Sequence, residues 1–159
     1  MLFSVRRVAP VVLVVCLGLV AGCGSNNKGK IEGKWKMVSP PDKGDAKAKA
    51  DMAKMGEMGM YLFMEFKPDG VFVIGLGADT EEKLNFFKAF APGGKLTWDA
   101  KYKLLNGDGV EVYDMPKDLQ TGSGGMFGNK DRGRANIKIN GDDMTMTDDS
   151  GTTKLTRIK

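Results

Sequence analysis

The chain has 159 residues, a formal net charge of +4 and no histidine. The absence of histidine removes the commonest general base and the usual zinc ligand. Both cysteines, Cys16 and Cys23, lie near the N-terminus, so the rest of the chain cannot form a disulfide or supply a nucleophilic thiol. We therefore expect that the protein is not an enzyme and that it has no metal site and no cofactor.

Residues 1–22 have the pattern of an export signal. Two arginines precede an apolar run at residues 8–20, which is shorter than the ~20 residues that a membrane-spanning helix needs. The run ends in Val20-Ala21-Gly22-Cys23, which resembles the lipobox of bacterial lipoproteins. This resemblance implies cleavage after Gly22 and attachment of acyl chains such as palmitate to Cys23. We therefore expect a lipoprotein that Cys23 anchors in a membrane of the bacterial cell envelope.

Cleavage changes the composition of the mature chain. The loss of Arg6 and Arg7 lowers the formal net charge of +4 by two, so we expect no nucleic-acid partner. Residues 23–30 are short and polar, which predicts a flexible lipidated tether that keeps the domain close to its membrane. Gly24, rather than an aspartate, follows the anchor, which favours the outer membrane over the inner one.

We expect residues 31–159 to form one domain built mainly from β-strands. Apolar and alternating segments predict strands at 31–38, 60–66, 71–76, 95–105, 110–115, 134–140, 143–148 and 153–158. Short strands joined by tight turns favour a small antiparallel eight-stranded up-and-down barrel. The stretch 115–133 differs from the rest because it is rich in glycine and lacks periodicity, which predicts a long loop.

Two further stretches have the periodicity of amphipathic helices. The first spans about residues 45–58 and the second about residues 79–91. The spacing of Asp79 and Glu82 is that of a capping box, so we expect Asp79 to be the N-cap of the second helix. The predicted architecture is thus a barrel with two short helices packed on it.

The predicted hairpin at residues 60–76 is apolar on both faces, although a small barrel buries only its inner face. We expect the two helices to cover its outer face, with Met52, Met55 and Met58 as part of the contact. Docking of the same surface on lipid or on a partner protein is an alternative.

Three residues near the two ends of the predicted domain match a known motif: Gly33, Trp35 and Arg157. Gly33 and Trp35 match the Gly-x-Trp of the first strand of calycins, the superfamily of lipocalins and fatty-acid-binding proteins, and Arg157 matches an arginine that packs on this tryptophan. The resemblance implies a monomeric lipocalin-like barrel that binds a small apolar ligand. The residues predicted to bind the ligand are Trp35, Leu96, Trp98, Tyr102 and Arg157, with Arg157 facing any carboxylate.

Two other functions remain open. The first is a non-catalytic interaction or structural protein of the envelope with a filled core, in which Trp35 and Arg157 only close the barrel. The second is Cu(I) handling, because Met52, Met55 and Met58 could offer three thioethers to one soft ion.

Overall fold

The computed structural model describes residues 24–43, 46–117 and 131–159. The predicted export signal, the predicted acylation site at Cys23 and most of the predicted loop at 115–133 lie outside these residues.

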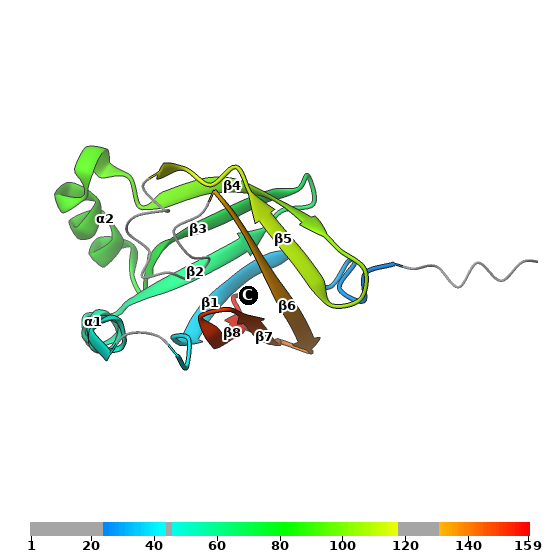
Figure 1. The fold of residues 1–159 in the computed structure, drawn as a ribbon. Helices are drawn as coiled ribbons and strands as arrows, with labels where there is room; N and C mark the ends of the chain where they lie inside the picture. Colours follow the sequence, from blue (N-terminus) through cyan, green and yellow to red (C-terminus); the bar gives the residue numbers. More distant parts are fainter. Residues whose placement is uncertain (1–23, 44–45, 118–130) are drawn as a thin grey trace, which may run out of the picture.

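The strands close into a barrel (Figure 1). In chain order they are β1 (Gly33–Ser39), β2 (Met60–Phe66), β3 (Val71–Ala78), β4 (Thr97–Leu104), β5 (Gly109–Tyr113), β6 (Arg132–Asn140), β7 (Asp143–Asp148) and β8 (Gly151–Arg157). Each strand pairs antiparallel with the next, and β8 returns to pair with β1. The predicted fold class is therefore confirmed as a mainly β, antiparallel eight-stranded up-and-down barrel with two short helices.

Side chains that alternate along each strand fill the interior of the barrel. Strand register places Trp35, Met64, Ile74 and Trp98 in one row across β1 to β4. Trp35 and Met64 are 0% exposed, which leaves no water-sized space beside them. Other interior side chains are exposed by 1% or less: Phe66, Phe72, Val110, Val112, Ile137, Met144, Met146 and Leu155. Around these residues the interior is filled by the protein itself.

Both helices lie at one end of the barrel (Figure 1). The helix α1 (Ala46–Glu57) joins β1 to β2, and α2 (Glu81–Phe90) lies between β3 and β4. In an up-and-down barrel these two connections fall at the same end, because alternate strands run in opposite directions. The sequence pattern placed both helices correctly along the chain.

The N-cap of α2 is Thr80 and not Asp79, as the capping-box spacing had predicted. The Thr80 hydroxyl accepts a hydrogen bond from the Lys83 N–H at 3.3 Å. Asp79 is held instead by a backbone bond, in which its N–H donates to the Gly59 carbonyl at 2.9 Å. This long-range bond extends the strand pairing by one residue and moves the start of the helix.

Met52 of α1 packs against the core of the barrel as predicted, but the prediction that both helices cover the outer face of the β2–β3 hairpin is wrong. Phe86 and Phe90 of α2 are 60% and 73% exposed. On the outer face, Phe63 lies opposite Gly75, where the missing side chain leaves room for the aromatic ring. The Lys34 ammonium lies 3.7 Å from the centre of the same ring. The Phe63 ring over Gly75 and the stem of Lys34, which reaches across from β1, thus cover the apolar outer face of the hairpin.

Residues 24–30, the described part of the predicted tether 23–30, do not form a free tether. They pack on the turn between β4 and β5, where the Asn26 N–H donates to the Gly107 carbonyl at 2.8 Å. Asn27 is only 3% exposed and Ile31 is fully buried. The polar side chains of Ser25 and Asn27 bond to backbone groups of the barrel, and this role could not be distinguished from that of a solvated tether in the sequence alone.

Candidate functional site: a methionine-rich groove

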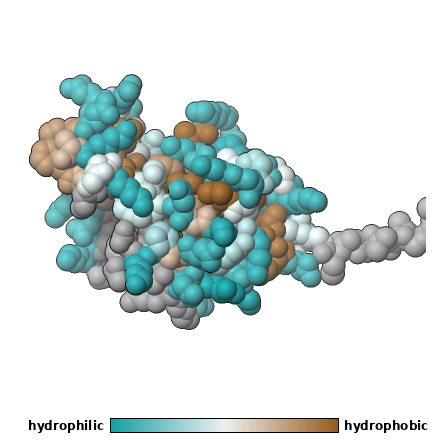
Figure 2. Space-filling view, turned by 90° about the horizontal axis from the view of Figure 1, so that it is seen from above, coloured by the Kyte–Doolittle hydropathy of each residue, from teal (hydrophilic) through white to brown (hydrophobic). Residues whose placement is uncertain are grey.

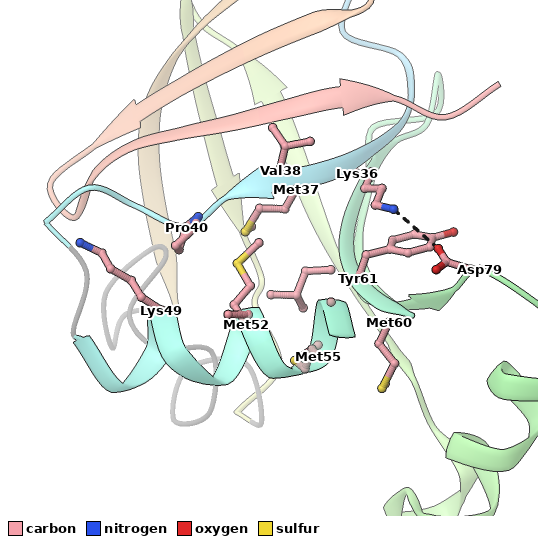
Figure 3. A pocket seen from close by; sticks show the side chains of 13 residues that line it. Lys36, Met37, Val38, Pro40, Lys49, Met52, Met55, Met60, Tyr61 and Asp79 are labelled. Atoms are coloured by element: carbon pink, nitrogen blue, oxygen red, sulfur yellow. Dashed lines mark ion pairs between the residues drawn. The ribbon is translucent and has the colours of Figure 1, made fainter. Parts of the chain in front are cut away.

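A groove with a volume of about 440 Å³ lies between α1 and the strands β1 and β2 (Figure 3). Its apolar lining includes Met37, Val38, Pro40, Met52, Ala53, Met55, Met60 and Leu62. The volume falls within the range of roughly 300–1,000 Å³ that is usual for small-molecule sites. The groove is therefore the strongest candidate site among the described residues.

Local sequence periodicity builds the two walls of the groove. Met52 and Met55 are three residues apart on α1, so they share one helix face. On the opposite wall, Met37 belongs to β1 and Met60 opens β2, and both are buried. Figure 3 shows the side chains of Met52 and Met37 pointing toward each other across the groove. Unbranched thioether side chains adapt to irregular apolar shapes, which suits a site for a flexible apolar chain.

Two lysines lie at the polar rim of this groove. The Lys36 ammonium is 3.7 Å from the Asp79 carboxylate and 4.4 Å from the centre of the Tyr61 ring. The Lys49 ammonium donates to the Asp42 carbonyl at 2.7 Å. Lys36, Lys49 and Asp79 together carry one net positive charge beside the apolar lining. An ammonium has three N–H donors and each of these contacts uses at most one, so the rim can still receive the anionic end of a molecule whose body is apolar.

The residues predicted from the calycin resemblance do not line the groove. Trp35 and Tyr102 belong to the filled core, and Trp98 packs partly exposed against it. The Tyr102 hydroxyl donates to the Lys67 carbonyl at 2.9 Å, and burial raises the pKa of this hydroxyl. Leu96 is buried near the start of β4, outside the main core cluster.

Arg157 and Trp35 do meet, as the resemblance implied. The guanidinium carbon of Arg157 lies 4.0 Å from the centre of the Trp35 ring. The two terminal nitrogens of Arg157 donate to the Glu32 and Lys30 carbonyls, both at 2.7 Å. Because these groups of Arg157 already have protein partners, the geometry favours closure of the barrel over binding of a ligand carboxylate.

The three methionines proposed for Cu(I) are not gathered in one place. Met52 and Met55 line the groove, whereas Met58 is 49% exposed and lies outside the lining. Met58 follows the last residue of α1, and positions i and i+6 on a helix are about 120° apart around its axis, so Met52 and Met58 do not share a face. Sequence analysis missed Met37 and Met60, because their part in the groove depends on contacts between distant segments. Within the described residues, no group of three or more histidine, cysteine, aspartate or glutamate side chains could hold a metal ion.

A cluster of charges lies on the outer wall of the barrel, away from the groove. The Glu111 side chain, only 1% exposed, lies 2.8 Å from the Lys103 ammonium and 2.6 Å from the Arg134 guanidinium. Arg132 adds a third cation at 3.6 Å. Hydrogen bonds from Lys103 and Arg134 lower the pKa of Glu111 to about 2. The sequence offered no signal for this cluster beyond alternation, because its members come from three strands.

No model of a protein family matches the chain, and no curated protein matches its sequence significantly.

None of the helices in the described part of the chain combines the length and the apolar character required to cross a membrane.

Proposed function

We propose that this protein is a non-catalytic lipoprotein of the bacterial envelope, anchored through acylated Cys23, whose groove binds a small apolar molecule with an anionic end. The observation that supports this proposal is the groove itself, with its methionine-rich lining and two lysines at the rim. A single acyl chain would lie between α1 and the barrel, and its head group would face Lys36 or Lys49. The outer membrane is the proposed location of the anchor.

The filled interior supports the groove over the barrel lumen as the binding site. A lipocalin-like ligand would need space beside residues such as Trp35, Phe66 and Ile137, which are all 0% exposed. Opening such space costs the dispersion contacts of a close-packed core. The groove needs no such rearrangement.

Calorimetric titration with laurate tests this proposal. The Met55→Asp variant should lose binding, because a carboxylate replaces apolar lining and repels the anionic end of the ligand. Met58→Asp is the matched control, since Met58 directly follows the last residue of α1 but lies outside the lining. Dodecanol should bind more weakly than laurate to the unaltered protein, because it offers the lysines no charge. Equal laurate binding by the two variants would reject the groove as the site.

A second candidate function is the docking of a partner protein on α2. Phe86 and Phe90 are largely exposed, and their rings are 4.8 Å apart between centres. Figure 2 shows apolar surface at the α2 end of the molecule. Contiguous exposed apolar side chains often mark protein interfaces. A photo-crosslinking residue at Phe90 should give one defined adduct in cells, and the same residue at Asn85 should not.

Cu(I) handling remains a third proposal with less support, because Met58 lies outside the lining of the groove that contains Met52 and Met55. Calorimetry with Cu(I) before and after replacement of Met52, Met55 and Met58 by leucine tests it. Equal heats would exclude these sulfurs as ligands.

A further inference from the structure

Residues 24–31 are bound to the end of the barrel that lies opposite the helices (Figure 1). Ser25 forms an isolated parallel bridge with Gly107, in the turn between β4 and β5. The Asn26 N–H donates to the Gly107 carbonyl at 2.8 Å, and the Asn26 side chain donates to the Asp108 carboxylate at 2.9 Å. These contacts begin with Gly24, whose carbonyl accepts a bond from the Gly107 N–H at 3.4 Å.

Two buried side chains, those of Asn27 and Ile31, fix the same segment against the barrel. The side-chain amide of Asn27 donates to the Ile137 carbonyl at 2.8 Å and to the Asp108 carbonyl at 3.3 Å. Asn27 is 3% exposed, so its partners would lose their donor if the segment left the barrel. Ile31 is fully buried and its carbonyl accepts the Trp35 indole N–H at 2.8 Å. The segment is thus continuous with the core and does not act as a hinge.

We propose that this docked segment holds the barrel in one orientation on the bilayer, with the β4–β5 turn facing the lipid head groups. The proposal rests on the acylation of Cys23 proposed above. Consecutive Cα atoms are ~3.8 Å apart, so an anchor at Cys23 lies one peptide unit from Gly24. Gly24 is itself bonded to Gly107, so only Cys23 and its glyceryl thioether separate the acyl chains from the barrel.

The opposite end of the barrel then points away from the membrane. The eight residues of β4 rise by roughly 26 Å at ~3.3 Å per residue, and this separates its two ends. The groove at α1 and the exposed Phe86 and Phe90 of α2 would therefore open to the aqueous phase. In this orientation the α2 surface faces away from the anchoring bilayer. Its partner is therefore a soluble protein or a surface that lies opposite this membrane.

Quenching by head-group nitroxides tests the orientation. The acylated protein, from which cleavage after Gly22 has removed Cys16, is placed in phosphatidylethanolamine–phosphatidylglycerol vesicles that contain a lipid with a nitroxide on its head group. A fluorophore is attached to a single new cysteine in Asn106→Cys, at the β4–β5 turn, or in Asn85→Cys, on α2. Both positions are exposed asparagines, and Cys23 carries no free thiol once it is acylated. We expect several-fold stronger quenching at position 106.

A flexible glycine–serine insertion between Gly24 and Ser25 is the matched variant. It keeps the docked contacts of Asn26 and Asn27 and should remove most of the difference between the two probes. A difference that survives the insertion would overturn the role of the segment. Equal quenching in the unaltered protein, or stronger quenching at position 85, would overturn the orientation. Intact mass and vesicle flotation are measured first, and a missing acyl mass would refute the anchor, and the orientation with it, before any quenching is compared.

Discussion

At the scale of single residues, Glu111 has the most unusual environment in the described chain. It is a carboxylate with almost no exposed surface, surrounded by Lys103, Arg134 and Arg132. Burial alone would raise the pKa of a carboxyl group. Here the bonds from Lys103 and then Arg134 outweigh burial, and they lower the pKa of Glu111 to about 2. The charged form is therefore the one that the fold stabilises.

This lowered pKa predicts a dependence of stability on pH. A carboxyl group whose pKa is lower in the folded state adds stability above its unfolded pKa, here 4.5, and loses that contribution as the pH falls toward 2. Urea unfolding at intervals from pH 6 to pH 2.5 should show this loss in the unaltered protein. Glu111→Gln should be less stable at pH 6, with a smaller further loss in acid. Glu57→Gln, on the exposed side of α1, is the control and should follow the unaltered curve.

At the scale of elements, Phe63 and Gly75 pack against each other on the outer face of the β2–β3 hairpin. A side chain at Gly75 would place its Cβ 2.8 Å from the Phe63 ring and 2.9 Å from the Leu96 carbonyl. Such distances are too short for carbon contacts, so Phe63 or the backbone would have to move. This explains why a glycine lies in the middle of β3, where it would otherwise weaken the strand.

Gly75→Ala should therefore destabilise the barrel by about 1–3 kcal/mol, the usual cost of overpacking. Gly56→Ala is the opposite case, because nothing lies within 4 Å of a Cβ at that position of α1. There the free energy of unfolding should rise by about 0.5–1 kcal/mol, since alanine loses less entropy in a helix than glycine. Urea denaturation of both variants measures the difference, and a neutral Gly75→Ala would contradict the packing described for Phe63.

At the scale of the whole molecule, Arg157 joins the two ends of the domain. It lies on the last strand, stacks on Trp35 of the first strand and bonds to carbonyls more than 120 residues earlier in the chain. These contacts lie beside the pairing of β8 with β1 that closes the sheet. A closed sheet has no free edge, which removes the usual template for aggregation.

Arg157→Ala should lower the free energy of unfolding by about 2–4 kcal/mol, because it removes a stacked cation and leaves two carbonyls without donors. Arg157→Lys should recover little of this loss, since an ammonium lacks the planar fork that reaches both carbonyls. Lys154→Ala, at an exposed position of the same strand, is the control. Thermal unfolding of the three variants checks this order of stabilities. Full recovery of stability in Arg157→Lys would show that only the charge of Arg157 matters.

The sequence by itself determined the barrel and the position of nearly every element. Along β4 the buried Ala100 and Tyr102 alternate with exposed charged residues, and this alternation is a local property of strands that can be read directly from the sequence. The motif formed by Gly33, Trp35 and Arg157 also correctly predicted a contact between the first and last strands. These features were predictable because each depends on periodicity or on a short motif.

Only the tertiary structure decided where the helices and the N-terminal segment lie. Met37 and Met60 joined Met52 and Met55 in the groove because β1, β2 and α1 meet at one end of the barrel. Asn27 became a buried residue through bonds to Asp108 and Ile137, which are 81 and 110 residues away. Polar composition is the same for a solvated tether and for a docked segment. The difference lies in distant backbone partners that no local pattern reveals.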